Sequence, residues 1–316
     1  MRRYLLFALF CLGLSRAQAQ EDTLLLLGKL IVQGEEDTVR ANLLIEIAEA
    51  YAESDPGKFD QYATEALRLC DKLKYYRGAA RIGRDIGRHH QIYVHDEFGA
   101  VEVYVNALRA AERAGDTLMV AQLYTDIGGA YVPLQRDSLS EDYLARAVRL
   151  ARTHGDTSLW SRALYSLARL RSLRGRIAEA LDIDRAGLRL ALAKGDSSLQ
   201  AKHEMSMGLS FNVQENADSA VYYLERAAAI FDTLEDHRFL AYTLGQLALV
   251  NWNSGGLANA DSLAARGLRI ALRYDLRKET MDNYRVLALL AAKRGDYKEA
   301  YANQVLYNAY FDSATN

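Results

Sequence analysis

The sequence contains very little proline and almost no cysteine. Only 2 prolines occur among its 316 residues, so almost nothing interrupts helix formation along the chain. It also lacks runs of alternating β-branched residues bounded by turn residues, which are the pattern of strands. These absences predict an all-helical protein. The 50% share of hydrophobic residues is ample for a core, and length alone allows one large domain or two smaller ones.

The two cysteines are Cys11, near the N-terminus, and Cys70. If the N-terminal segment is removed, only Cys70 remains, and an internal disulfide is excluded. Cys70 occupies an apolar position in the run 66–70, with no histidine or basic residue beside it that would favour a thiolate. We therefore expect a buried, structural cysteine in a fold that is held together by packing.

The first twenty residues differ in composition from the rest. Arg2 and Arg3 precede an uncharged, mostly apolar stretch at 4–14, and Ala17-Gln18-Ala19 has the small-x-small pattern that signal peptidase accepts. This predicts a secretory signal peptide, residues 1–19, cleaved after Ala19, and hence a periplasmic or secreted protein. The alternatives are a membrane anchor, for which the stretch is too short, and lipid attachment at Cys11, which the bulky Phe10 disfavours. Cleavage would remove three arginines and change the formal net charge from −2 to −5.

The rest of the chain repeats with a period of about 40 residues. The pair Gly-Asp recurs at 115–116, 155–156 and 195–196. Small residues recur in the same register at Ala107, Ala147, Gly187, Ala227 and Gly267, and again at Ala48, Gly87, Gly128, Ala168, Gly208, Ala248 and Ala288. This periodicity predicts about seven units over 37–311, preceded by a capping helix at 20–36 and followed by a short tail at 312–316.

Each unit has the pattern of two amphipathic helices. In one of them, residues 240–250 and 257–273 carry apolar residues at helical spacing and are separated by a break at 253–256. The glycine of each Gly-Asp pair suits the left-handed residue after a helix, and the aspartate suits the N-cap of the next helix. Glycines inside the helices, such as Gly187, indicate close approach of neighbouring helices.

The small residues carry a resemblance to a known family. With the first small residue numbered as position 8 of a unit, small residues also occupy positions 20 and 27, as in Gly208, Ala220 and Ala227. This spacing resembles the tetratricopeptide repeat, whose usual unit is shorter by six residues and has a proline that is missing here. The resemblance implies a right-handed α-solenoid of antiparallel helix pairs.

A second resemblance covers the start of the mature chain. The segments at 22–25, 37–38, 54–59 and 62–67 are similar to exported tetratricopeptide sensor regions of bacterial signalling proteins. In that group a membrane helix normally follows, and then a histidine kinase or a helix-turn-helix regulator. The sequence ends at Asn316 without such parts, so we expect either a truncated or stand-alone relative, or one whose output function lies on another polypeptide.

Catalytic and metal-binding motifs are missing from the sequence. The six histidines show no zinc spacing, and there is no H-E-x-x-H, P-loop or G-x-S-x-G motif. We therefore expect no enzyme, no metal and no cofactor. The export signal and negative net charge disfavour nucleic acid as a partner.

The family resemblance also assigns a concave face. It implies that positions 2, 5, 9 and 12 of the first helix in each unit line the groove, and these hold mainly arginines and aromatic residues: Arg81, Arg84, Arg88, Arg162, Tyr165, Arg169, Lys202, Tyr242, Trp252 and Arg285. One interpretation is a solvated face of mixed charge. The other is a groove for a protein or peptide partner, with an acidic segment favoured because arginine binds carboxylates. We expect an exported interaction module or, alternatively, the sensor region of a signal-transduction protein.

Overall fold

The computed structural model describes residues 25, 36–52 and 55–315. The expected signal peptide (1–19) lies outside this part, as does the expected capping helix (20–36) apart from Leu25 and Glu36. All regular structure in the described part is helical, with fourteen α-helices, one short π-helix and no strand. The predicted all-α fold is confirmed. No helix in the described part is both long and apolar enough to cross a membrane.

The chain divides into two compact units, residues 1–130 and 131–316, which are described separately. The helices of unit 1 are α2 (Thr38–Tyr51), α3 (Pro56–Leu73), α4 (Tyr76–His89), the π-helix η1 (His90–Val94), α5 (Glu97–Arg113) and α6 (Thr117–Tyr131), whose last residue falls in unit 2. Those of unit 2 are α7 (Asp137–His154), α8 (Thr157–Leu173), α9 (Ile177–Lys194), α10 (Ser197–Val213), α11 (Ala217–Thr233), α12 (His237–Asn253), α13 (Leu257–Arg273), α14 (Arg277–Arg294) and α15 (Tyr297–Thr315). Residues 312–315 thus continue the last helix beyond the expected boundary at 311.

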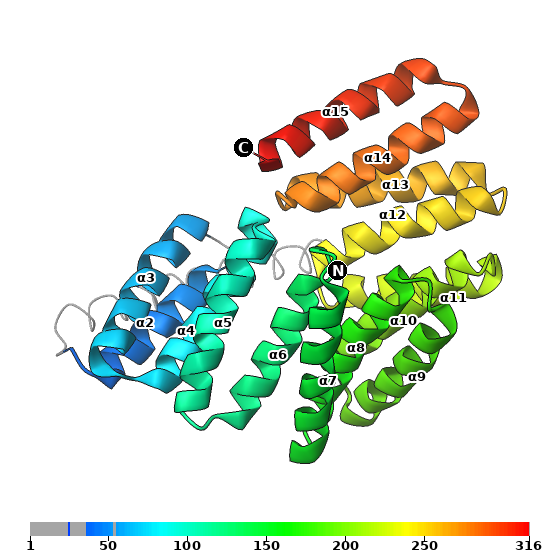
Figure 1. The fold of residues 1–316 in the computed structure, drawn as a ribbon. Coiled ribbons are helices and arrows are strands. Elements are labelled where there is room, and N and C mark those ends of the chain that lie inside the picture. Colours follow the sequence, from blue (N-terminus) through cyan, green and yellow to red (C-terminus); the bar gives the residue numbers. More distant parts are fainter. Residues whose placement is uncertain (1–24, 26–35, 53–54, 316) are drawn as a thin grey trace, which may run out of the picture. The chain divides into compact units, whose positions relative to one another are not determined.

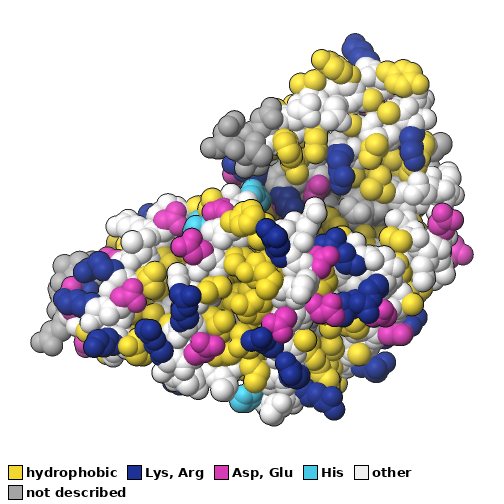
Figure 2. All heavy atoms as spheres, viewed as in Figure 1, with side chains coloured by type: hydrophobic (Ala, Val, Ile, Leu, Met, Phe, Trp, Pro, Cys, Tyr) yellow, Lys and Arg dark blue, Asp and Glu magenta, His cyan; other side chains and the backbone are white. Residues whose placement is uncertain are grey.

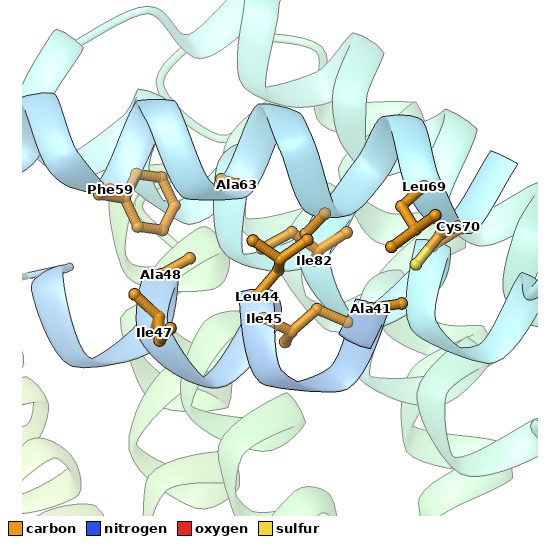
Figure 3. Close-up of a cluster of buried hydrophobic side chains, with 12 residues drawn as sticks. Ala41, Leu44, Ile45, Ile47, Ala48, Phe59, Ala63, Leu69, Cys70 and Ile82 are labelled. Carbon is orange, nitrogen blue, oxygen red and sulfur yellow. The ribbon is translucent and has the colours of Figure 1, made fainter. Parts of the chain in front are cut away.

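The core of unit 1 is formed where α2, α3 and α4 meet. Leu44, Ile45 and Ile47 from α2 pack with Phe59 from α3 and Ile82 from α4, and none is more than 1% exposed (Figure 3). Burial of each such side chain contributes about 1.5–3 kcal/mol before the cost in conformational entropy. The core also contains Cys70, which is fully buried, and burial raises the pKa of its thiol to about 11. The expectation of a buried cysteine is confirmed.

Unit 2 consists of successive helix pairs stacked side by side (Figure 1). Each odd-numbered helix from α9 to α15 packs against the even-numbered helix before it. The even-numbered helices α8, α10, α12 and α14 also contact one another in order, and they form one layer of the unit. This layer contains the residues that the family resemblance assigns to the groove, from Arg162 to Arg285.

The joints between pairs follow the sequence prediction. Gly155 ends α7 with φ of 69° and Gly195 ends α9 with φ of 73°, in the left-handed region where a side chain is strained. The Oδ1 atom of Asp156 then accepts a hydrogen bond from the Leu159 amide at 2.9 Å, and Asp196 does the same for Leu199 at 3.0 Å. Each Gly-Asp pair therefore ends one helix and caps the next.

Glycines inside the helices lie where another group leaves no room for a side chain. A Cβ on Gly187 would lie 2.1 Å from His203 Cε1, and one on Gly87 would lie 2.4 Å from Tyr104 Cε1. A Cβ on Gly267 would meet both Asn283 and the backbone oxygen of Ala241, the latter at 3.0 Å. In all three cases the atom nearest to the added Cβ belongs to a side chain, and only at Gly267 does a backbone atom of another helix also come close.

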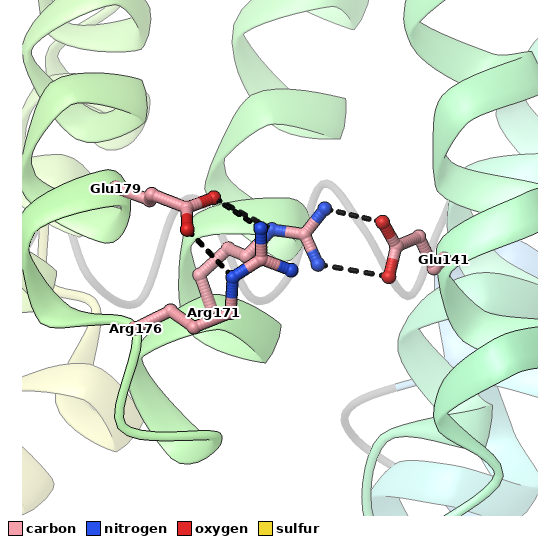
Figure 4. Close-up of polar contacts among 4 residues, drawn as sticks. All are labelled: Glu141, Arg171, Arg176 and Glu179. Carbon is pink, nitrogen blue, oxygen red and sulfur yellow. Dashed lines mark hydrogen bonds and ion pairs between the residues drawn. The ribbon is translucent and has the colours of Figure 1, made fainter.

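An ion-pair network ties three consecutive helices of unit 2 together (Figure 4). Arg171 on α8 holds Glu141 on α7 with two parallel hydrogen bonds, one of 2.9 Å, and its Nε lies 3.6 Å from Glu179 on α9. Arg176 donates to the same Glu179 at 2.7 and 2.6 Å. The Arg171 side chain is 13% exposed, so this network is better shielded from water than an ordinary surface pair.

Candidate functional site

Two of the groove arginines in unit 1 are neutralised by carboxylates of the same unit. Arg81 donates to both oxygens of Glu49, at 2.6 and 2.5 Å, and Arg84 donates to Asp126 at 2.5 Å. The Arg84 and Asp126 side chains are only 13% and 15% exposed. Each pair links α4 to another helix, so the charges of Arg81 and Arg84 are already balanced by carboxylates of the fold.

Arg88, the third groove arginine of unit 1, is exposed and borders a cavity of about 690 Å³. We call this cavity the unit 1 pocket. Its walls come from the C-terminal part of α2 (Glu49, Ala50, Ala52), from Phe59 of α3, from α4 (Arg84, Asp85, Arg88, His89) and from Ile92 and Tyr93 of η1. A mixture of apolar walls and a few polar groups in a space of this size is typical of a binding site.

Two acidic groups, Asp85 and Glu49, line the unit 1 pocket, and Asp85 is the more strongly affected by its surroundings. Burial, and then repulsion by the neighbouring Glu49 carboxylate together with a hydrogen bond to it, raise the pKa of the Asp85 carboxyl to about 6. Arg84 and Arg88 act in the opposite direction. The two carboxyl groups therefore share one environment in which a positive charge is favoured.

His89 forms part of the same wall. Its ring stacks against Phe59 at a centroid distance of 4.4 Å and lies 4.9 Å from the Tyr93 ring. The side chain is 4% exposed, and neither ring nitrogen has a hydrogen-bond partner among the described residues; Nδ1 lies 3.5 Å from Asp60 Oδ1 without hydrogen-bond geometry. Burial lowers the pKa of the imidazole, so the ring is neutral near pH 7.

In unit 2, the groove residues Tyr165 and Tyr242 lie on α8 and α12. Burial raises the pKa of the Tyr165 phenol to about 12 and also raises the pKa of Tyr242. The charge of Arg169 opposes both shifts, and the two phenols interact with each other. Both tyrosines are half-buried while Arg169 is exposed, so the three form one surface across two helices of the inner layer.

Arg285 and Asp282 extend this surface onto α14. The two charges lie 3.7 Å apart, and both act on Tyr242, where Asp282 raises the pKa and Arg285 lowers it. Arg285 also borders a hollow of about 320 Å³ between α14 and α15 that is lined by Leu289 and Tyr301. We call Tyr165, Arg169, Tyr242, Asp282 and Arg285 the unit 2 surface.

The other groove residues lie on the same layer. Lys202 on α10 lies over the Phe239 ring, with Nζ 4.8 Å from the centroid, and Trp252 on α12 lies under Lys293 at 5.4 Å. Arg162 on α8 is half-buried and engaged within the fold. The visible face of the molecule in Figure 2 shows both charge signs interspersed with hydrophobic side chains, rather than an expanse of one sign.

A polar cluster in unit 2 was not foreseen from the sequence. His203 Nδ1 lies 2.8 Å from Asp184 Oδ1, and Nε2 lies 3.1 Å from Ser161 Oγ. No sequence motif marks this cluster, because its residues lie on three different helices. All three side chains have zero exposure, so Ser161 is not accessible to a substrate and we assign the cluster to the packing of α8, α9 and α10.

The unit 1 pocket also escaped the sequence analysis, although a weak indication of it was present. The two small residues Gly87 and Gly128 are 41 apart instead of 40. One extra residue is what a π-helix accommodates, and η1 falls between them.

Among the described residues, no group of three or more His, Cys, Asp or Glu side chains could hold a metal ion.

No protein-family model and no curated protein match the chain. Solved structures do resemble it. NprR in complex with its cognate peptide NprX has a TM-score of 0.67, 17% identity, and coverage of 92% of this chain and 82% of NprR. A Rap protein complexed with competence and sporulation factor has a TM-score of 0.64 and 14% identity, over 94% of this chain and 99% of that one.

A third similar structure is a signal transduction ATPase (STAND protein) with a tetratricopeptide repeat sensor from Pyrococcus horikoshii, with a TM-score of 0.56 and 13% identity. The match covers 87% of this chain and 48% of that one. By its fold, the chain is therefore a tetratricopeptide-type helical repeat protein, as the spacing of its small residues suggested.

Proposed function

We propose that the chain is an exported interaction module that binds a protein or peptide partner through the unit 2 surface. The observation that carries this proposal is the arrangement of Tyr165, Arg169, Tyr242 and Arg285 on α8, α12 and α14, where the phenols of Tyr165 and Tyr242 interact and arginine charges act on both. Tyrosine and arginine are the residues most enriched in binding hot spots. The similar structure of NprR is in complex with its cognate peptide NprX, which supports a peptide as the partner here.

An acidic segment is the partner that this surface favours. Arg169 and Arg285 present two exposed guanidinium groups beside half-buried tyrosine rings, and a guanidinium can bind a carboxylate with two parallel hydrogen bonds. In unit 1, Arg81 and Arg84 form close ion pairs of 2.5 Å with Glu49 and Asp126, whereas Arg285 lies 3.7 Å from Asp282 and its side chain is 51% exposed. The negative net charge of the chain argues against nucleic acid as the partner.

A selection of binders from a randomised peptide library tests the proposal. Selected peptides should be enriched in Asp and Glu, and Arg169→Glu with Arg285→Glu should weaken their binding at least tenfold in fluorescence anisotropy. The matched control is Arg189→Glu, because Arg189 is exposed on the outer helix α9. Equal binding by the charge-reversal variant and the control, or failure to select any peptide, would contradict the proposal.

The export half of the proposal is tested separately. Expression with its own N-terminus in a bacterium with secretion machinery should give a periplasmic protein whose first residue is Gln20, as intact mass spectrometry would show. A protein that keeps residues 1–19 and sediments with membranes would instead indicate an anchor.

A second candidate function is the sensor region of a signal-transduction protein. The solved ATPase supports it, because that protein has a tetratricopeptide repeat sensor and about half of its chain resembles this fold. Co-purification of the chain with a membrane-bound kinase or regulator encoded beside its gene would favour this alternative over a stand-alone module.

A further inference from the structure

The unit 1 pocket has a binding chemistry that differs from that of the unit 2 surface. Its cavity of about 690 Å³ is large enough for a small amphipathic molecule or for one or two residues of a peptide. The apolar part of its wall is formed by Phe59, Ile92 and Tyr93. The charged groups around it decide which ligand it accepts.

Two of the three arginines near the pocket are already paired with carboxylates. Arg81 of α4 is held by Glu49 of α2, and Arg84 of α4 is held by Asp126 of α6. Of the α4 charges that border the pocket, this leaves the Asp85 carboxyl, which is half-buried and for which the described residues show no ion pair, and Arg88, which is exposed. The Asp85 carboxyl is thus more buried than the Arg88 guanidinium.

The neighbouring carboxylates also favour a cation in the pocket. Asp85 lies beside Glu49, whose charge repels its own, and Asp60 of α3 lies beside His89 at the same wall. Each Glu49 oxygen accepts one bond from Arg81 and retains capacity for another. An anion in the pocket would face these carboxylates, and of the two arginines that line it, Arg84 is paired with Asp126 while Arg88 acts on Asp85 without a close ion pair among the described residues.

The His89 ring points to a ligand that donates hydrogen bonds. The ring is only 4% exposed, and both of its nitrogens lack a hydrogen-bond partner in the described part of the chain. A neutral imidazole has one nitrogen that can only accept, and a buried acceptor without a donor costs about 1–3 kcal/mol. A donor-bearing ligand would remove this cost.

The shape of the wall also suits a cation. Phe59 and Tyr93 flank His89, and aromatic rings attract a cation that lies over their faces. Tyr93 is on the π-helix η1, a local insertion of the kind found frequently at functional sites. The insertion brings Ile92 and Tyr93 to the pocket wall, beside the carboxyl groups.

We propose that the unit 1 pocket binds a primary ammonium group carried on an apolar or aromatic chain. The ammonium lies against the carboxyl groups of Asp85 and Glu49, and its apolar part contacts Phe59, Ile92 and Tyr93. An amine with three donors fits this set of acceptors. The proposal does not depend on the unit 2 surface, and either can fail alone.

The probes are three molecules of similar size: 2-phenylethylamine, 2-phenylethanol and 3-phenylpropionate. Isothermal titration calorimetry with the full mature chain should show saturable binding of the amine at pH 7, at least tenfold tighter than binding of the alcohol or the acid. The amine should bind about tenfold more weakly at pH 5 than at pH 7, because protons then compete for the Asp85 carboxyl, whose pKa is about 6.

Asp85→Asn should weaken binding of the amine at least tenfold and remove most of its dependence on pH. Asp71→Asn is the matched control, an exposed aspartate of the same unit, and should bind like the wild type. Circular dichroism melting confirms that each variant is folded. Tighter binding of 3-phenylpropionate, unchanged binding by a folded Asp85→Asn, or no binding of the amine at millimolar concentration would overturn the proposal.

Discussion

His203 Nδ1 lies 2.8 Å from Asp184 Oδ1, and neither side chain has any exposed surface. The hydroxyl of Ser206 donates to the other Asp184 oxygen at 2.6 Å, and Ser161 Oγ donates to the Gly187 carbonyl at 2.9 Å. This polar cluster therefore links α8, α9 and α10 through buried hydrogen bonds. Because every member has a partner, the cluster stabilises one relative position of the three helices.

Asp184→Ala should destabilise unit 2 by about 3–5 kcal/mol, because it leaves His203 and Ser206 buried without their acceptor. Urea unfolding followed by circular dichroism measures the change. The control is Asp182→Ala on the same helix, since Asp182 is exposed and pairs only with Arg185 one turn away. We expect a loss below about 0.5 kcal/mol there, and similar losses for both variants would contradict the assignment.

Gly187→Ala should also be destabilising, by about 1–3 kcal/mol, because its Cβ would lie 2.1 Å from the His203 ring. Gly187→Leu should lower the melting temperature further. Gly57→Ala, in α3, provides a contrast. Its Cβ would lie 3.5 Å from Asp55 Oδ1, which is an ordinary contact, so replacing this helical glycine should leave stability unchanged or raise it. The melting temperature of Gly187→Ala should fall below that of the wild type, and that of Gly57→Ala should not.

Asp85→Asn should stabilise the protein at neutral pH. The folded pKa of about 6 is above the unfolded value of about 3.9, so the native state binds the proton more tightly. The contribution of Asp85 to stability is therefore greatest below pH 3.9 and declines as pH rises through 6, by about 2–3 kcal/mol in all. The variant should gain most over the wild type at pH 7.5 and least at pH 4, as measured by urea unfolding. A difference independent of pH would show that Asp85 titrates normally.

Arg84→Met should destabilise unit 1 by about 3 kcal/mol, because it leaves the Asp126 carboxylate poorly solvated without its partner. Arg81→Met removes a more exposed pair, with side chains 41% and 35% exposed, and should cost less than about 1 kcal/mol. Hydrogen exchange of the α4 and α6 amides would localise the effect of the first variant. Equal losses would mean that burial does not distinguish the two pairs.

Much of the fold could be predicted because repeat architecture is visible in one dimension. Gly155, Gly195 and the aspartates after them act through bonds to residues within a few positions, so their roles as helix ends and caps follow from local chemistry. The small residues at 40-residue spacing indicated where helices approach each other, and Gly187 and Gly267 lie at such positions.

The candidate sites could be predicted only in part. Phase within the repeat placed Tyr165, Arg169, Tyr242 and Arg285 on the inner helices, but it gave no account of which charges have partners. Arg84 pairs with Asp126, and His203 Nε2 lies 3.1 Å from the backbone oxygen of Ser161, each across 42 residues. Such partners belong to neighbouring inner helices and carry no pattern in the local sequence.

The sequence by itself determined the helical repeat, its joints and the helices that carry the arginines, because these depend on contacts between near neighbours and on one recurring period. Only the tertiary structure decided that Arg81 and Arg84 are neutralised, that Asp85 lies beside Glu49 in a pocket, and that His203 is buried with Asp184. Those outcomes depend on burial and on charges from distant helices, and both quantities exist only after the helices have packed.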